Sequence, residues 1–350
     1  MAQANASQRL QAAWTSRGPL AWLLAPLALI HGVLVRLRQT LYRIGVWRIQ
    51  RLPVPVIVVG NLIAGGAGKT PTVIAVTTLL RQHGWRPGIV SRGYGRRDRG
   101  VVEVDAHTAA ADCGDEPRLL HTRTAAPVVV AHDRVAAARA LLQAHPEVDV
   151  IVSDDGLQHL RLGRRVQVVV FDDRGAGNGW LLPAGPLREP VPRRVPPNTL
   201  VLYNARSPST ALPGWTARRS LRGLLPLRDW WAGAAAVPQA LQRFAGEPVL
   251  AAAGTAQPQR FFDMLGAAGV RVRPLPLADH HDFATLPWPA ETSDVIVTEK
   301  DAIKLDPARM GSTRVWVAPL DFEPDPAFNA ELLKLLPPPP PRTHDGHATA

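Results

Sequence analysis

From Pro55 onward the chain alternates short, β-branched apolar runs with longer stretches of helical pattern. The runs PVIVVG, PGIVS, PVVVA, VDVIVSDD and VQVVVF are almost continuously apolar, and TPTVIAVTTLLRQHG after the first run predicts a helix. Continuous apolar runs are typical of parallel strands that helices cover on both faces. The pattern therefore predicts a doubly wound α/β fold.

Between Arg174 and Pro197 the chain is too rich in glycine and proline for regular structure, and a loop this long is usually functional. Further on, EPVLAAAG, PQRFFDMLGAAG, VRVRPLPL, SDVIVTEK and TRVWVAPL repeat the α/β alternation before a final helix near 328–336. We therefore predict four parts: an N-terminal helical segment (1–50), a larger α/β domain (51–225), a smaller α/β C-terminal domain with its connecting segment (226–336) and a disordered tail (337–350).

The N-terminal stretch PLAWLLAPLALIHGVLV, Pro19 to Val35, is apolar and is followed by arginines at positions 36, 38, 43, 48 and 51. No small-residue cleavage site follows it, which argues against a signal peptide. An apolar helix beside arginines suits a membrane surface, where the arginines contact anionic headgroups. A helix buried in the protein core is the alternative interpretation.

The stretch NLIAGGAGKTPTV ends in the Gly-Lys-Thr of phosphate-binding loops, yet Ile63 stands where the strict pattern has its first glycine. Such a loop needs positive φ angles, and Gly65 and Gly66 can supply them at shifted positions. Lys69 is expected on the β- and γ-phosphates of ATP and Thr70 on Mg²⁺, at a helix N-terminus that favours anions. The predicted ATP-binding residues are Gly65, Gly66, Ala67, Gly68, Lys69 and Thr70. A glycine turn before an ordinary helix is the alternative.

Nucleotide-bound Mg²⁺ needs a further carboxylate at the end of a nearby strand. Asp154 and Asp155 follow an apolar run in VDVIVSDDGLQH, so these two residues and Thr70 are the predicted metal ligands. An Asp-Gly pair also forms ordinary turns, which is the alternative for this segment.

The formal net charge of +11 would suggest an anionic partner, but only four of the 40 basic residues are lysine. The excess of arginine, together with abundant alanine, is consistent with a coding bias, so we expect no nucleic-acid partner and infer no obligate protein partner. The few lysines are more informative, because Lys69, Lys300 and Lys304 lie in motifs. The single cysteine excludes an internal disulfide and fits the cytosol or a cytosolic membrane face.

Two nucleotide-binding classes fit poorly. Membrane ATPase switches have a lysine before the Gly-Gly pair, where this chain has Ala64, and the nearest match to a guanine motif, TEKD at 298–301, has its lysine one place late. The chain instead resembles the tetraacyldisaccharide 4'-kinase family in VGNLIAGGAGKTP, SRGYGRR, GDEPRLL, DDGLQHLRL, LLPAGPLRE, AAAGTAQPQRFFDML, LADHHDF and VTEKDAIKL, from about residue 20 to about residue 336. The family's loop also lacks the first glycine, so Ile63 is a family variant.

The resemblance implies transfer of the ATP γ-phosphoryl group to the 4'-hydroxyl of an acylated disaccharide 1-phosphate in lipid A biosynthesis, at the cytoplasmic face of the bacterial inner membrane. Together with the phosphate loop, it implies that the fold is of the P-loop NTPase type, that 51–225 form a P-loop kinase domain and that the segment 1–50 is membrane-associated. It also implies that Asp115 in GDEP and His280 in ADHHDF are catalytic, and the choice of His280 over His281 rests on the family match. From the residues alone, a helix N-cap for Asp115 and a loop histidine for His280 are alternatives.

Five residues are predicted to bind substrate. Arg92 and Tyr94 in SRGYGRR follow a strand, Arg134 and Arg188 carry guanidinium groups that match phosphate, and Gln158 adjoins the predicted metal ligands. A solvated arginine loop and a polar helix start are the alternatives. Two other functions also stay open: a P-loop kinase of a soluble small molecule, and a membrane-associated ATPase switch.

Overall fold

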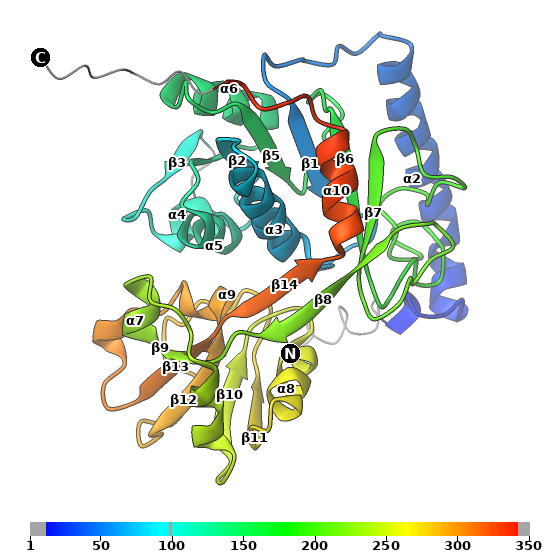
Figure 1. Ribbon diagram of the computed structural model, residues 1–350. Helices are drawn as coiled ribbons and strands as arrows, with labels where there is room; N and C mark the ends of the chain where they lie inside the picture. The colour runs from blue at the N-terminus through cyan, green and yellow to red at the C-terminus, as the bar shows by residue number, and fades with distance from the viewer. Residues whose placement is uncertain (1–11, 98–99, 342–350) are drawn as a thin grey trace, which may run out of the picture.

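The computed structural model describes residues 12–97 and 100–341 and builds them around two β-sheets (Figure 1). The larger sheet has nine strands in the order β14-β8-β7-β6-β1-β5-β2-β4-β3. Only the two edge strands, β3 and β14, run antiparallel to their neighbours. The strands are β1 (Val56–Gly60), β2 (Pro87–Ser91), β3 (Val102–Val104), β4 (Val128–Val130), β5 (Val150–Asp154), β6 (Val166–Asp172), β7 (Thr199–Asn204), β8 (Trp215–Leu221) and β14 (Leu320–Pro324).

Helices cover both faces of this sheet, which explains why its strands are apolar at almost every position. In β1, Ile57 and Val59 face one buried cluster, while Val56 and Val58 face another on the opposite side. The first cluster holds side chains of α3, α5 and α10, and the second those of α6. The helices are α3 (Lys69–Gln82), α4 (Ala110–Cys113), α5 (Asp115–Thr124), α6 (Arg134–Ala144) and α10 (Pro326–Lys334). The predicted doubly wound α/β architecture is confirmed.

The predicted second α/β pattern forms a five-stranded sheet in the order β11-β10-β12-β13-β9, parallel except for β9. Its strands are β9 (Leu225–Pro226), β10 (Val249–Ala253), β11 (Val272–Pro276), β12 (Asp294–Thr298) and β13 (Arg314–Ala318). It carries the helices α7 (Leu227–Trp231), α8 (Pro258–Ala267) and α9 (Glu299–Ala302), and the 3₁₀ segments η1 (Pro238–Phe244) and η2 (Pro307–Arg309).

After β13 the chain returns to the larger sheet. β14 pairs with β8, and Phe328 and Leu332 of α10 are buried in the larger sheet's core. This packing differs from the predicted division, which placed everything from 226 to 336 in the smaller domain. A local pattern predicts a strand and a helix but not the sheet on which they pack. Residues 342–350 of the predicted disordered tail lie outside the described residues.

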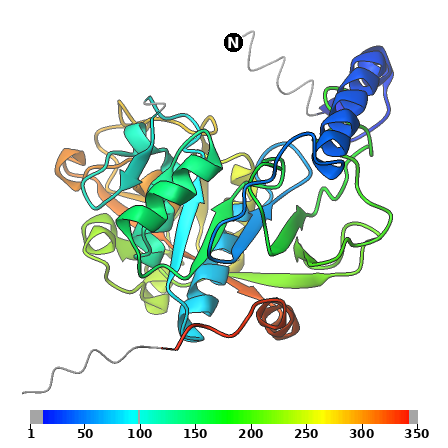
Figure 2. The same cartoon turned by 90° about the horizontal axis from the view of Figure 1, so that it is seen from above.

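The N-terminal helix α2 (Pro19–Arg43) runs farther than Val35 and lies along one edge of the molecule (Figures 1 and 2). It packs against the Gly/Pro-rich loop between β6 and β7, where the Trp22 and Trp180 rings meet edge to face at 4.7 Å. Only 17% of its most apolar 18-residue window is buried, and its length and composition suffice to cross a membrane. The alternative of a buried core helix is therefore wrong. Residues 1–11, the start of the predicted helical segment, lie outside the described residues.

Candidate active site

The phosphate loop connects β1 to α3 at the carboxyl end of the central strands. Positive φ angles occur at Gly65 (+87°) and Gly68 (+94°), whereas the sequence suggested Gly65 and Gly66. A Cβ atom at position 68 would lie 2.0 Å from Asn204 Nδ2, which donates a 2.9 Å hydrogen bond to the Ala67 carbonyl. Asn204, at the end of β7, therefore fixes the loop and requires glycine at position 68.

Ile63, in place of the first glycine, has no exposed surface and forms a bridge with Leu187. The next residue, Ala64, donates its backbone N–H to the Pro186 carbonyl at 2.7 Å. The first half of the loop is thus held by pairing with the Gly/Pro-rich segment, and this explains why an apolar side chain fits where a strict phosphate loop has glycine.

Lys69 is nearly buried at the start of α3, with 9% of its surface exposed. Its Nζ donates to Asn61 Oδ1 at 3.3 Å and lies 3.6 Å from Asp155 Oδ1. Asn61 Nδ2 in turn donates to the Gly65 carbonyl at 3.0 Å, so the amide aligns both the loop and the lysine. Sequence reasoning missed Asn61; its only signal is a polar residue directly after a buried strand.

Asp154 ends β5 and is 1% exposed. Ser91 Oγ donates to its Oδ2 at 2.9 Å, while Oδ1 has no hydrogen-bond partner among the described residues. Burial, followed by the charges of Glu116 and Asp155, raises the pKa of Asp154 to about 7. A buried carboxylate oxygen without a partner is unfavourable unless a cation or a donor reaches it.

Asp155 adopts a left-handed conformation (φ +47°), so the Asp-Gly turn exists and also directs a carboxylate into the site. Arg188 Nη1 contacts both carboxylate oxygens, at 3.0 and 3.1 Å. Burial alone would raise the pKa of Asp155, but the charges of Lys69 and Arg188 outweigh it and lower the pKa. The pKa values of these neighbouring carboxylates thus shift in opposite directions, because Asp154 is fully buried while Lys69 and Arg188 lie beside Asp155.

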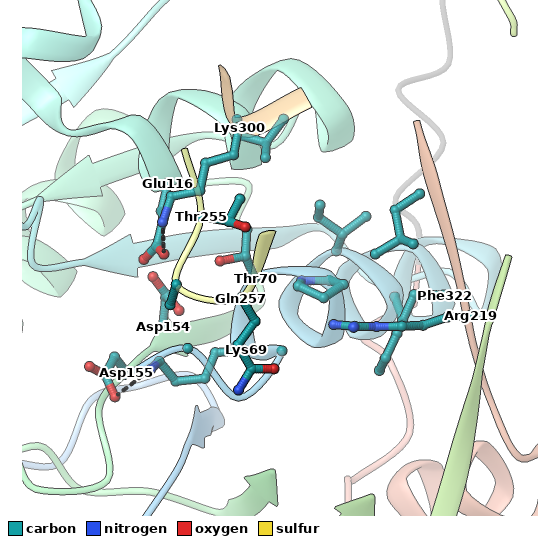
Figure 3. A pocket seen from close by; sticks show the side chains of 18 of the residues that line it. Lys69, Thr70, Glu116, Asp154, Asp155, Arg219, Thr255, Gln257, Lys300 and Phe322 are labelled. Carbon is teal, nitrogen blue, oxygen red and sulfur yellow. Dashed lines mark hydrogen bonds and ion pairs between the residues drawn. The ribbon is translucent and has the colours of Figure 1, made fainter. Parts of the chain in front are cut away.

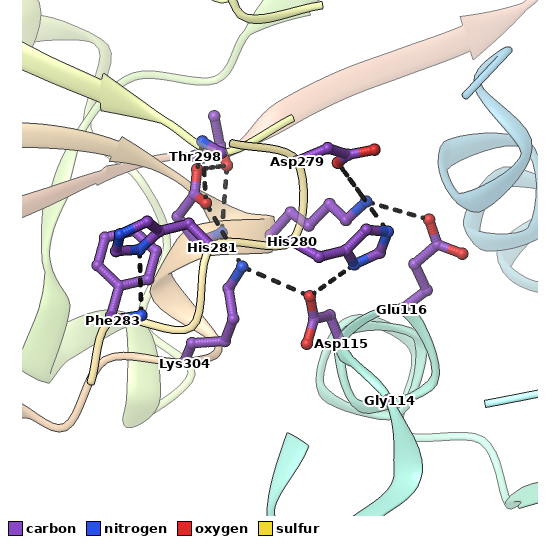
Figure 4. Close-up of polar contacts among 12 residues, drawn as sticks. Gly114, Asp115, Glu116, Asp279, His280, His281, Phe283, Thr298 and Lys304 are labelled. Atoms are coloured by element: carbon purple, nitrogen blue, oxygen red, sulfur yellow. Dashed lines mark hydrogen bonds and ion pairs between the residues drawn. The ribbon is translucent and has the colours of Figure 1, made fainter. Parts of the chain in front are cut away.

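Asp115 and His280 meet across the two domains. His280 Nδ1 lies 3.0 Å from Asp115 Oδ2 (Figure 4). The N-cap alternative for Asp115 is wrong, since Gly114 occupies that position and the carboxylate caps no N–H of α5. Burial alone would raise the pKa of Asp115, but the hydrogen bond from His280 and the charge of Lys304 lower it. His280 has a φ of +60°, a conformation that a non-glycine residue rarely adopts without a reason.

His281 faces the other way. Its Nδ1 accepts the Phe283 backbone N–H at 3.1 Å, and the two rings meet edge to face at 4.7 Å. The sequence left the choice between the two histidines to the family match, and this geometry favours His280 for the pair with Asp115.

The SRGYGRR loop reaches the same place. Tyr94 is 70% exposed, and its ring centroid lies 5.7 Å from that of His280. A Cβ atom at Gly93 would lie 2.5 Å from the Cys113 carbonyl, so only glycine allows the loop this close to the start of α5. Arg92 Nη2 lies 3.1 Å from His132 Nε2.

The remaining two predicted residues, Gln158 and Arg134, differ in their position relative to the site. Gln158 Oε1 accepts from Arg188 at 3.3 Å, and its amide donates to the Asn61 carbonyl at the same distance, so it lies within the site. Arg134 is 4% exposed, and its guanidinium contacts backbone carbonyls, including that of Asp155 at 3.3 Å. Arg134 therefore supports the backbone at Asp155 from the protein interior and does not reach an open surface.

A cavity of about 1720 Å³ unites these groups, with walls from both domains (Figure 3). Thr255 and Gln257 of the smaller domain face the phosphate loop across it, while Arg219 and Phe322 lie beyond α3. The predicted residues that line the cavity are Gly65, Gly66, Gly68, Lys69, Thr70, Arg92, Tyr94, Asp154, Asp155, Gln158, Arg188 and His280. Ala67, Asp115 and Arg134 lie behind this lining.

Sequence reasoning assigned no role to Glu116 or Lys300, which also line the cavity. Lys300 Nζ lies 3.4 Å from Glu116 Oε1 and 3.6 Å from Asp279 Oδ1, and so links α9 of the smaller domain to α5 of the larger one. The scarcity of lysine in this chain is the signal that pointed to this segment.

Comparisons with known proteins agree with this architecture. The family model described as tetraacyldisaccharide-1-P 4'-kinase matches residues 20–337. A tetraacyldisaccharide 4'-kinase of Methylibium petroleiphilum is 59% identical over 334 residues, covering 94% of this chain and 93% of that protein. One of Leptothrix cholodnii is 57% identical over 336 residues, covering 94% and 96%. A crystal structure of LpxK from Aquifex aeolicus in complex with ATP matches with a TM-score of 0.74 and 27% identity, covering 91% of this chain and 99% of that one.

Proposed function

The chain belongs to the tetraacyldisaccharide 4'-kinase family, and from this premise we propose how its residues perform the reaction. The protein is a lipid A 4'-kinase that transfers the γ-phosphoryl group of ATP to the 4'-hydroxyl of a tetraacyldisaccharide 1-phosphate. The bond from the γ-phosphorus to the bridging oxygen of ADP breaks, a bond to the sugar oxygen forms, and the hydroxyl proton passes to the enzyme. The observation that carries the assignment is one cavity that joins a phosphate loop to a carboxylate–histidine pair.

The phosphate loop binds the ATP triphosphate. Gly65 to Thr70 supply backbone N–H groups at the start of α3, where the helix dipole favours negative charge. Lys69 is already aligned by Asn61 and contacts the β- and γ-oxygens. The solved relative in complex with ATP supports ATP as the donor.

The carboxylates at the end of β5 suit Mg²⁺. The described residues contain no group of three or more His, Cys, Asp or Glu side chains that could hold a metal alone. Mg²⁺ binds proteins through one or two carboxylates and takes its other ligands from phosphates and water. Asp154, whose Oδ1 is unpartnered, Asp155 and Thr70 are the proposed ligands. When bound there, the ion would neutralise charge on the β- and γ-phosphates.

Asp154→Asn should lower kcat by roughly 100-fold, because the amide cannot replace the carboxylate as an anionic ligand. The Mg²⁺ concentration for half-maximal activity should rise. Thermal stability should stay the same or increase, since a buried carboxylate is replaced by a neutral group that can still accept from Ser91. Magnesium titrations of activity and a melting curve test this; unchanged magnesium dependence would remove Asp154 from the metal site.

His280 and Asp115 are proposed to accept the hydroxyl proton as one unit. With Nδ1 engaged by Asp115, Nε2 is the ring nitrogen left to take a proton, and His280 lines the cavity while Asp115 does not. Asp115 fixes the tautomer and stabilises the imidazolium that forms. Because the partners come from different domains, the pair is complete only while the domains are in contact.

The substrate phosphate and sugar are proposed to bind Arg92, Tyr94, Gln158 and Arg188, with Arg134 supporting the Asp155 backbone from behind. Arg188 joins the β6–β7 loop to Asp155, and His31 Nε2 of α2 lies 3.1 Å from the Arg188 carbonyl. The cavity therefore opens beside α2, where an anionic lipid would approach from a membrane.

Membrane attachment through α2 is proposed, with the enzyme at the cytoplasmic face of the inner membrane. The helix exposes Leu23 (75%), Leu27 (54%), Ile30 (57%) and Leu34 (58%) along one side. Arg36 and Arg43 follow at its carboxyl end, where anionic headgroups would attract them.

The triple variant Leu23→Gln, Ile30→Gln and Leu34→Gln should reduce sedimentation with vesicles and activity on lipid substrate several-fold, since buried apolar area drives such binding. These side chains are exposed, so the melting temperature should not fall. Val101→Gln with Val237→Gln is a matched control, because both valines are 50% exposed elsewhere. Undiminished sedimentation of the triple variant would refute membrane attachment through this face.

The reaction itself is tested with γ-labelled ATP and the acylated disaccharide 1-phosphate in detergent micelles. Label is expected in the lipid, and Asp115→Ala should strongly reduce it. Label in a water-soluble acceptor would indicate a kinase of small molecules, and release of free phosphate alone would indicate an ATPase switch.

A further inference from the structure

Lys304 is a buried cation of the smaller domain beside the catalytic pair. Its side chain is 7% exposed, and Nζ makes no hydrogen bond to the described residues. Two carboxylates flank it instead, with Asp115 Oδ2 at 3.4 Å and Asp301 Oδ1 at 3.7 Å (Figure 4). The Phe283 ring centroid lies 5.4 Å from Nζ. An ammonium group is buried at a cost, so its charge needs a reason.

Neither carboxylate depends on Lys304 for a hydrogen bond. Asp301 Oδ2 accepts from Thr298 Oγ1 at 2.6 Å, and both Asp301 oxygens accept from the Gly254 N–H at 3.1–3.2 Å. Asp115 Oδ2 is the partner of His280. What Lys304 adds is therefore positive charge beside Asp115, from a residue that does not line the cavity.

We infer that Lys304 is a positioning residue that balances the charge of Asp115 and so holds the Asp115–His280 pair ready to accept a proton. This inference rests on the proposed role of that pair as the base. A carboxylate that no cation balances favours the protonated form of the pair it belongs to, and a pair that already holds a proton accepts none. The lysine partly offsets the Asp115 charge that His280 experiences and keeps Asp115 from taking up the proton itself.

The other charged groups around the pair do not replace Lys304. Lys300 is held between Glu116 and Asp279, and Asp279 Oδ1 lies 3.9 Å from His280 Nε2. The Cys113 thiol, whose pKa burial raises to about 11, stays uncharged near Asp115. Among the residues that the structure describes, Lys304 is the ammonium in direct contact with Asp115, and its charge lowers the pKa of that carboxyl.

Lys304→Met tests this role through the pH profile of kcat/KM for the lipid substrate. Removing the cation raises the apparent pKa of the coupled pair, whichever member holds the proton, so the acid limb should move to higher pH. The expected shift is on the order of one pH unit, from an opposite charge at this distance. At pH values below the limb, kcat/KM of the variant should therefore be roughly tenfold lower than that of the wild type. On the alkaline side the two values should be the same. Recovery would also show that the variant is folded.

Two companion variants sharpen the result. Lys304→Arg keeps the charge and should leave the acid limb near its wild-type position. Lys334→Met removes the 71%-exposed lysine of α10, which pairs with Glu331, and should change neither rate nor profile. The KM for ATP should stay constant in all three, because Lys304 does not line the cavity.

The outcomes separate this inference from the function beneath it. A loss in Lys304→Met that is the same at every pH, and that Lys304→Arg shares, would show a merely structural lysine and overturn the inference. Asp115→Ala should be impaired throughout the pH range without alkaline recovery. Full activity of Asp115→Ala would overturn the base assignment, and the role of Lys304 with it.

Discussion

Lys69→Ala is expected to lower kcat for phosphoryl transfer by roughly 100- to 1000-fold, the range for loss of one preorganised charge-stabilising donor. The lysine Nζ is held at the cavity wall by Asn61 and Asp155, so it meets the γ-phosphate without reorganising. Removing it does not leave Asp155 alone, because Arg188 contacts both of its oxygens. The fold should therefore survive the substitution.

The measurement is single-turnover transfer from labelled ATP to the lipid, with a melting curve of the same preparation. Lys334→Ala, on the exposed face of α10, is the matched control and should retain full activity. A Lys69→Ala protein that melts like wild type and keeps substantial kinase activity would refute the phosphate-loop assignment.

The phosphate loop and the sheet were predictable because their signals are local. A buried strand, a glycine turn and Lys-Thr lie within fifteen residues, and both faces of the strands are apolar. The residues that align the loop were not predictable in this way. Asn204 reaches Ala67 from the end of β7, and Leu187 pairs with Ile63 from the loop before it. Such contacts depend on the order of strands in the sheet, which no local pattern contains.

The return of β14 and α10 to the larger sheet escaped prediction for a similar reason. Their apolar residues could cover either sheet, and the choice depends on where β8 leaves an open edge. For α2 the sequence predicted an exposed helix at a membrane surface and left a buried core helix as the alternative, because tertiary packing decides between the two. Its small residues Ala21, Ala28 and Gly32 face the protein, whereas its large ones are mainly exposed.

The proposed catalytic pair illustrates the same limit within the site. Sequence alone could not choose between His280 and His281. The two adjacent residues have the same side chain, and the backbone conformation of the loop decides which of them points toward Asp115. The left-handed residue is His280, which meets Asp115, while His281 accepts the Phe283 N–H within its own loop. A substitution at position 281 should thus affect the loop's stability more than the chemistry.

Asp115→Ala and His280→Ala are each expected to lower kcat by about 100- to 10,000-fold, the usual contribution of general acid–base catalysis. The affinity for ATP should change little, since the phosphate loop and the base lie on different parts of the cavity wall. Once either partner is missing, the other cannot act: a lone imidazole lacks its orienting carboxylate, and a lone carboxylate lies behind the lining.

The double variant should therefore be little worse than either single one, because residues that act as one unit are non-additive. Single-turnover rates of the two single variants and the double variant test this, with ATP binding measured on each protein. His281→Ala is the neighbouring control and should retain far more activity than His280→Ala. Strictly multiplicative losses, or a larger defect at position 281 than at 280, would separate the two residues. The contact between Asp115 and His280 would then have only a structural role. A shared loss would instead identify this contact as the place where the sugar hydroxyl gives up its proton.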